Sequence, residues 1–220
     1  MFRMIENILT PEEVAELRKI GDEAQFVDGK ISNPHSTVKD NLHLNDQQAH
    51  RRCVEIMAKA LLSNEDLRNF AVPRQCAPPI LTRYEPGMRY GIHPDAALMP
   101  IGNTTIRADI SCTIFLDPPE SYEGGHLRIC LGTEEVRIKG NPGSAILYPS
   151  HTLHEVEKVT SGRRLVGLTF IQSRIQDTRM RELLYELGEV AALEGLKMDP
   201  ENYARLQSVQ FNLSRMLSEN

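Results

Sequence analysis

The chain has 220 residues, of which 40% are hydrophobic and 25% are charged, a composition that excludes a disordered or fibrous protein. Its formal net charge is −5 with Lys and Arg spread along the chain, so we expect no nucleic-acid partner, which usually needs a basic stripe. The sequence contains no signal-like or membrane-length apolar run and no CxxC pair among its four cysteines, which predicts a cytoplasmic protein with reduced thiols and no membrane contact.

Helical patterns dominate the first 77 residues. Residues 10 to about 24 begin with Thr10 as a helix cap and Glu13 as its capping-box partner. Residues 45–70 form a second helical zone, whose expected apolar stripe is Val54, Met57, Ala58, Leu61 and Leu62. We therefore predict that residues 1–77 are a helical support region.

From about residue 78 the pattern changes to short apolar runs separated by glycine- and proline-rich turns. Seven such runs follow one another: ILTRY, RADISCTIFLDP, GGHLRICL, EEVRIKG, GSAILYPS, HTLHEVEKV and RRLVGLTFIQS. No helical pattern fits between them, which disfavours βαβ units and predicts a sandwich or barrel-like pair of sheets over residues 78–175.

Helical patterning returns after Gln172. The expected apolar stripes are Met180, Leu183, Leu184 and Leu187 in one helix, and Leu206, Val209, Leu213 and Met216 in the next. We interpret residues 176–220 as a C-terminal helical extension that packs on the core or forms an oligomer interface. The predicted fold class is mainly β with flanking helices.

A His-x-Asp pair in the β region indicates a metal site. Residues i and i+2 of an extended chain point to the same face, so His93 and Asp95 can converge on one ion. A second imidazole from a later strand would complete a two-His-one-carboxylate set, which leaves one side of the metal open and is typical of non-haem iron(II) oxygenases.

The candidates for the third ligand within the β region are His126, His151 and His154. Arg164 follows His154 by ten residues across a Ser-Gly turn, and arginine binds carboxylates in a bidentate fork. If the two residues lie on adjacent antiparallel strands, they share one pocket, which favours His154. Arg163 is the alternative anchor.

The order and spacing of these residues resemble those of the prolyl 4-hydroxylase-like oxygenases, and most closely the bacterial PKHD-type hydroxylases. The resemblance rests on Tyr84-x-x-Gly87-x-x-Tyr90-x-x-His93-x-Asp95, Gly124-Gly125, the run Gly143 to Pro149, His154 and Arg164. It implies a double-stranded β-helix (jelly-roll) core. It also implies that His93, Asp95 and His154 bind Fe(II), that Arg164 pairs with the distal carboxylate of 2-oxoglutarate, and that Tyr84 lies near this co-substrate.

Phe115 departs from the family pattern, because some relatives place a tyrosine there beside the 2-oxoglutarate tail. We therefore expect Ser111 or Thr113, on the same strand face, to assist Arg164. Arg107 and Asp109 also share a strand face, and they pair either near the pocket or at the surface.

The sequence thus predicts a dioxygenase that uses Fe(II), O₂ and 2-oxoglutarate to hydroxylate an unactivated C–H bond, releasing succinate and CO₂, with ascorbate as a candidate reductant. The substrate is a small molecule, a peptide (a prolyl residue is one option) or a protein, and residues 24–45 and 96–106 are the expected substrate loops. A homodimer through the terminal helices is a further expectation. The alternative is a cupin-like metal- or ligand-binding protein that is non-catalytic or independent of 2-oxoglutarate.

Overall fold

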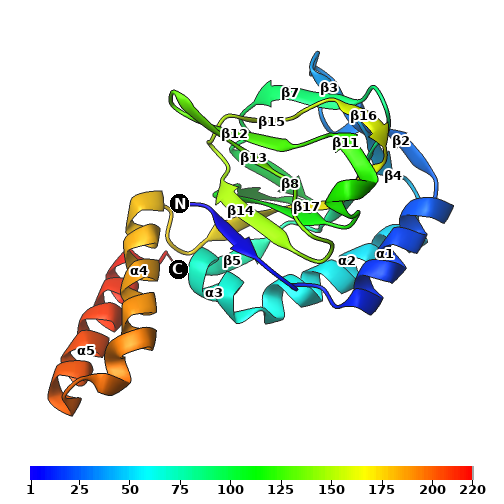
Figure 1. The fold of residues 1–220 in the computed structure, drawn as a ribbon. Coiled ribbons are helices and arrows are strands. Elements are labelled where there is room, and N and C mark those ends of the chain that lie inside the picture. The colour runs from blue at the N-terminus through cyan, green and yellow to red at the C-terminus, as the bar shows by residue number, and fades with distance from the viewer. Residues whose placement is uncertain (220) are drawn as a thin grey trace.

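Two antiparallel sheets face each other at the centre of the computed structural model, which describes residues 1–219 (Figure 1). The larger sheet has the strand order β1-β14-β10-β17-β6-β4-β2, with β5 also paired to β17. The smaller has the order β13-β12-β15-β7-β3, and two ribbons, β8-β9 and β11-β16, stand beside the pair.

The strands are β1 Arg3–Ile5, β2 Phe26–Asp28, β3 Lys39–Asp40, β4 Leu42–Leu44, β5 Pro73–Cys76, β6 Ile80–Tyr84, β7 Arg89–His93, β8 Leu98–Ile101, β9 Thr104–Arg107, β10 Ile110–Phe115, β11 Tyr122–Gly124, β12 Leu127–Leu131, β13 Glu134–Ile138, β14 Ala145–Pro149, β15 His154–Val156, β16 Val159–Gly162 and β17 Arg164–Ser173. The helices are α1 Pro11–Glu23, α2 Gln47–Ser63, α3 Glu65–Ala71, α4 Thr178–Glu194 and α5 Pro200–Leu217. Three 3₁₀ turns are η1 Gly29–Ser32, η2 Pro119–Ser121 and η3 Gly195–Lys197. Each of the seven predicted runs contains a strand, and the first 77 residues contribute strands β1 to β5 as well as helices.

Helices α1, α2 and α3 cover the outer face of the larger sheet (Figure 1). The predicted capping box of α1 is present: Thr10 Oγ1 accepts a hydrogen bond from the Glu13 amide, and Glu13 accepts one from the Thr10 amide. The predicted stripe of α2 is partly wrong, because Leu62 is exposed and the buried face is Cys53, Ile56, Met57, Ala60 and Leu61. The helix is rotated slightly from the expected orientation.

The alternation of side chains along the larger sheet separates two cores. Outward-facing side chains such as Ile114 and Leu165 pack under the helices. Inward-facing side chains such as Tyr84 and Phe115 pack against Ile129 and its neighbours from the smaller sheet. The space between the sheets therefore combines apolar packing with a set of inward polar residues that belong to the candidate site.

Helices α4 and α5 form a hairpin that projects away from the sheets (Figure 1). The predicted stripe of α4 is wrong at Met180 and Leu183, which are exposed, whereas Arg181, Leu184, Tyr185 and Ala191 are buried. No residue of α5 within the described range is buried. None of the helices in residues 1–219 combines the length and the apolar character needed to cross a bilayer.

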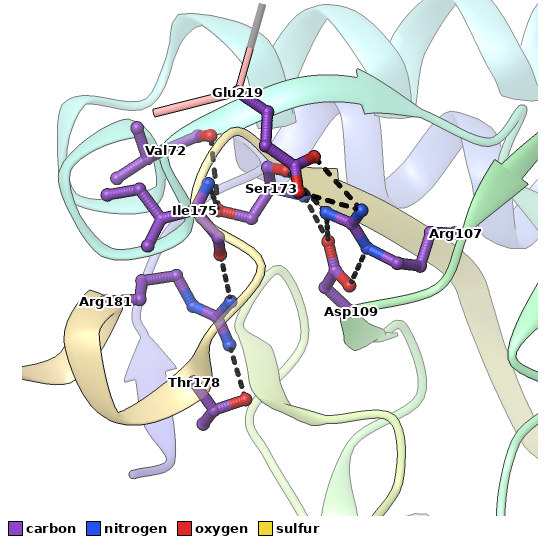
Figure 2. A network of polar contacts seen from close by, with 8 residues as sticks. All are labelled: Val72, Arg107, Asp109, Ser173, Ile175, Thr178, Arg181 and Glu219. Atoms are coloured by element: carbon purple, nitrogen blue, oxygen red, sulfur yellow. Dashed lines mark hydrogen bonds and ion pairs between the residues drawn. The ribbon is translucent and has the colours of Figure 1, made fainter. Parts of the chain in front are cut away.

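A polar network fastens this hairpin to the sheets (Figure 2). Arg107 donates hydrogen bonds to Asp109 at 2.7 and 3.0 Å and to Glu219 at 3.0 Å, and Asp109 also accepts from the Ser173 amide at 2.9 Å. Arg181 donates to the Ile175 carbonyl at 3.0 Å. Neither Arg107 nor Asp109 lines the cavity between the sheets, so of the two expectations the structure favours an ion pair away from the pocket.

Candidate metal and co-substrate site

The predicted metal ligands come together in the smaller sheet. His93 ends β7 and His154 begins β15, and the two residues are direct partners in the antiparallel register. Asp95 follows His93 after Pro94, which lies just past the end of β7, where a missing backbone donor costs no ladder hydrogen bond. One ligand atom from each of His93, Asp95 and His154 lies within 4.8 Å of the others.

Both imidazoles turn Nε2, the nitrogen that is free to bind a metal, toward Asp95. His93 Nδ1 lies 2.7 Å from the Gly91 carbonyl and His154 Nδ1 lies 2.9 Å from the Thr152 carbonyl. A carbonyl oxygen can only accept, so both Nδ1 atoms carry the proton and both Nε2 lone pairs are free. These Nε2 atoms lie 4.0 and 3.6 Å from the carboxylate oxygens of Asp95, a spacing that one ion spans after a slight closing of the side chains.

Neighbouring groups fix the ligands in place. Ser111 Oγ donates to Asp95 Oδ2 at 2.5 Å, and the Ser150 hydroxyl lies 2.8 Å from Ser111 Oγ. The Tyr90 ring stacks on His93, with the ring centroids 3.6 Å apart. Burial, reinforced by His154, lowers the pKa of His93 to about 4, so the imidazole is neutral at pH 7, as metal binding requires.

Arg164 lies on the larger sheet, and its side chain enters the same cavity. It is 1% exposed, and its Nε and Nη1 atoms have no hydrogen-bond partner among residues 1–219. Its guanidinium carbon lies 5.1 Å from the Tyr84 ring centroid, and Arg164 and Tyr84 are register partners on β17 and β6. The Tyr84 hydroxyl accepts from Asn41 Nδ2 at 3.0 Å, so its own hydrogen is free to donate. An unpaired buried guanidinium beside a free phenol donor fits a carboxylate.

Two details of the prediction are wrong. His154 and Arg164 do not lie on adjacent strands: β15 belongs to the smaller sheet and β17 to the larger, so the two residues reach the cavity from opposite walls. Ser111 does share the inward face of β10, but its hydroxyl bonds Asp95 instead of Arg164, so that half of the expectation is wrong. Thr113, the other expected helper, also lines the cavity, and its role beside Arg164 stays a prediction.

The competing residues lie elsewhere. Arg163 pairs with Asp117 and Asp22 on the helix side of the sheet. His126 pairs with Glu157 at 3.0 Å, and His151 is exposed. None of the three lines the cavity that holds the cluster.

The cavity between the sheets has a volume of about 790 Å³. Both predicted substrate loops contribute to its wall, residues 24–45 through η1 and the segment from Lys39 to His43, and residues 96–106 through the β8-β9 ribbon. No sequence pattern pointed to four further residues that are buried and line the cavity: Lys39, Asn41, His43 and Thr82.

Comparison with known proteins places this geometry in context. Residues 79–172 match the model of the 2OG-Fe(II) oxygenase superfamily. A PKHD-type hydroxylase of Sphingopyxis alaskensis is 54% identical over 216 residues, which cover 98% of this chain and 99% of that protein. A PKHD-type hydroxylase of Alteromonas mediterranea is 38% identical, again over 98% of this chain and 99% of the relative.

Solved structures share the fold at low sequence identity. A Pseudomonas putida prolyl-4-hydroxylase matches with a TM-score of 0.55 and 18% identity, covering 79% of this chain and 92% of that one. HygX from Streptomyces hygroscopicus, solved with nickel, 2-oxoglutarate and hygromycin B, matches with a TM-score of 0.55 and 14% identity, covering 79% and 84%. Together with the two facing sheets, these likenesses confirm the predicted double-stranded β-helix core.

Proposed function

Because this chain belongs to the PKHD-type hydroxylases of the 2OG-Fe(II) oxygenase superfamily, we propose that His93, Asp95 and His154 hold its iron and that Arg164, with Tyr84, anchors its 2-oxoglutarate. The chain is an Fe(II)- and 2-oxoglutarate-dependent hydroxylase. The alternative of a non-catalytic or 2-oxoglutarate-independent binding protein is disfavoured by its full-length similarity to hydroxylases.

One observation carries the assignment of residues: the triad and an unpaired buried guanidinium face the same cavity. Three protein ligands leave positions open for a 2-oxo acid and O₂. When bound, the iron supplies the oxidation of an unactivated C–H bond, coupled to conversion of 2-oxoglutarate to succinate and CO₂, and ascorbate is a candidate reductant for it.

The protein's own residues hold and orient the reactants. Backbone carbonyls fix both histidine tautomers, and Ser111 fixes the rotamer of Asp95. Arg164 lies on a central strand of the larger sheet, so its guanidinium is rigidly placed to hold the co-substrate tail. Leu127, Val156 and Leu168 contribute apolar side chains to the cavity wall.

The test is a titration of 2-oxoglutarate into the Fe(II)-loaded protein without oxygen, followed by measurement of succinate formation in air. His93→Ala should lose iron binding and succinate formation. Arg164→Met should raise the KM for 2-oxoglutarate roughly 30-fold or more, because a buried charged partner is lost.

Arg163→Met is the matched control, because Arg163 is adjacent to Arg164 in the sequence but pairs with Asp117 outside the cavity. It should leave the KM for 2-oxoglutarate unchanged. Succinate formation by His93→Ala at the wild-type rate would exclude the proposed triad.

We propose an amino-acid or peptide substrate, with a prolyl residue as one candidate. The structural similarity to the Pseudomonas putida prolyl-4-hydroxylase supports this candidate. Incubation with free proline and prolyl peptides, followed by mass spectrometry for a gain of one oxygen, tests it.

We also propose that the chain forms a homodimer through α4 and α5. Exposed apolar side chains of these helices and of η3 between them support this: Met180, Leu183, Val190, Leu193, Leu196, Val209, Phe211 and Met216. Sedimentation of the wild type should give a dimer that Leu196→Lys weakens, and a monomer at all concentrations would contradict the proposal.

A further inference from the structure

Lys39 places a second cation in the cavity. It lies on β3, paired with Tyr90 of β7, and is only 5% exposed. Its Nζ lies 5.4 Å from the centroid of the Tyr90 ring, and that ring stacks on the metal ligand His93. Lys39 and His93 therefore both lie beside the Tyr90 ring.

This ammonium has no anionic partner within the protein. Its hydrogen-bond acceptor is the Ser32 hydroxyl at 2.6 Å, and no carboxylate in residues 1–219 lies within 4.0 Å of it. Asp28 and Asp95 act on it only from a greater distance, and burial lowers the pKa of Lys39 to about 8, which leaves the amine mostly charged at pH 7. A buried lysine without a counter-ion is costly, which indicates that an anion completes the site.

Lys39 and Arg164 enter the cavity from different sheets, because β3 belongs to the smaller sheet and β17 to the larger. Lys39 bonds Ser32, which is exposed, and the adjacent Ile31 on η1 is 70% exposed. Arg164 lies among Tyr84, Tyr122 and Val159, all of which are buried, so it marks the closed end of the cavity. If 2-oxoglutarate pairs with Arg164 through one carboxylate and binds the metal through the other, the anion at Lys39 belongs to a different molecule.

Further polar atoms of residues that line the cavity also lack partners. Asn41 Oδ1, His43 Nε2 and Thr82 Oγ1 are buried and make no hydrogen bond within the described chain. His43 and Thr82 are register partners on β4 and β6, and Lys39 is close enough to His43 to contribute, after burial, to lowering the pKa of His43 to about 4. The unpaired imidazole nitrogen of His43 and the Thr82 hydroxyl give the cavity hydrogen-bonding groups suited to a polar ligand.

We infer that Lys39 is a specificity residue that binds a carboxylate of the substrate to be hydroxylated. The substrate class is then a free carboxylic acid, such as an amino acid or the C-terminal residue of a peptide, instead of a residue within a polypeptide. This inference rests on the proposed function, because it assigns the closed end of the cavity to 2-oxoglutarate.

The test uses protein loaded with Ni(II), which does not turn over, and with saturating 2-oxoglutarate so that the Arg164 end is filled. Calorimetry then compares three acids with their amides: L-proline and L-prolinamide, N-acetyl-L-proline and N-acetyl-L-prolinamide, 3-methylbutanoate and 3-methylbutanamide. In the wild type, at least one acid should bind about tenfold more tightly than its amide, the effect of one charged hydrogen bond.

Lys39→Met should reduce that preference to less than about twofold, and Lys39→Arg should restore it, because only the second variant keeps a cation. Lys30→Met is the matched control, since Lys30 is an exposed lysine of η1 that does not line the cavity. It should keep the full preference.

Three results would overturn the inference: no acid preferred over its amide, a preference that survives Lys39→Met, or a Lys39→Met variant that binds 2-oxoglutarate as weakly as Arg164→Met. Each leaves the proposed function intact, provided that wild-type protein binds Ni(II) and 2-oxoglutarate. Failure of that first binding step would instead refute the proposed function, and this inference with it.

Discussion

Asp95 is the most constrained side chain of the cluster. One oxygen lies 4.0 Å from His93 Nε2, while the other lies 3.6 Å from His154 Nε2 and accepts the 2.5 Å hydrogen bond from Ser111. The hydroxyl holds the carboxylate in one rotamer before any ion arrives. Ser111 therefore pre-organises the site without being a ligand.

Ser111→Ala should weaken metal binding roughly 10- to 100-fold, the usual effect of losing a group that orients a ligand. Competition between the protein and a fluorescent chelator for Fe(II) or Ni(II) measures it. Ser144→Ala is the control, because Ser144 is an equally buried serine that donates to the Asn141 carbonyl, away from the cluster. Equal metal affinity in both variants would show that the hydrogen bond from Ser111 is not needed to orient Asp95.

At this scale the sequence revealed the residues whose spacing carries chemistry. His93 and Asp95 stand two apart on an extended segment, and Arg164 follows a glycine turn, so all three were predictable. Lys39 and Asn41 come from a polar stretch with no periodic pattern. Only the crossing of the chain from β3 to β4, from one sheet to the other, turns them inward.

The Gly124-Gly125 turn is the element that makes room for Arg164. Both glycines have positive φ, at 66° and 64°, where L side chains are strained. A Cβ on Gly125 would lie 2.9 Å from Val159 Cγ2 and 3.2 Å from Arg164 Cδ. The close contact of Gly125 with Arg164 Cδ thus helps to set the position of the guanidinium.

Gly125→Ala should destabilise the fold by about 1–3 kcal/mol and raise the KM for 2-oxoglutarate several-fold, because Arg164 must shift. Urea denaturation and succinate kinetics measure the two effects. Gly132→Ala isolates the loss of stability, since Gly132 has φ 67° but no atom within 4 Å of an added Cβ. It should lose stability alone, and an equal rise in KM would contradict this role of Gly125.

The sequence predicted which long strands and helices exist more readily than it predicted which face of each helix is buried. Long strands such as β10 and β17 are wholly or largely buried and carry strong apolar runs, so they were predicted. Strands β1 to β4 have only two or three residues and mixed burial, too short for a period of two to show. The α4 stripe failed because the helix packs against α3 near its start, where Tyr185 meets Phe70, and then projects beyond the core, leaving apolar side chains exposed.

Across the whole molecule, the chain's last described residue is joined to the rim of the cavity. Glu219 contacts Arg107, which ends the β8-β9 ribbon, and that ribbon supplies Leu98 and Met99 to the cavity wall (Figure 2). The projecting hairpin and the predicted substrate loop thus share one ion-paired network.

Glu219→Gln should speed amide hydrogen exchange in residues 98–107 by roughly two- to fivefold, the effect of losing a partly exposed ion pair. Mass spectrometry of the exchanged protein reports it by segment. Glu201→Gln is the control, because it removes an exposed pair with Arg205 on α5 that touches no loop. Identical exchange in the two variants would mean that Arg107 is held by Asp109 alone.

The depth of Arg164 also dictates the order of events in a catalytic cycle. If Arg164 anchors 2-oxoglutarate and the substrate lies between it and the exposed side chains of η1, as proposed, a bound substrate blocks the way to Arg164. On that proposal the co-substrate enters first and its spent product leaves last. Excess substrate should consequently slow the enzyme by trapping it before the product escapes, giving inhibition that is uncompetitive toward 2-oxoglutarate.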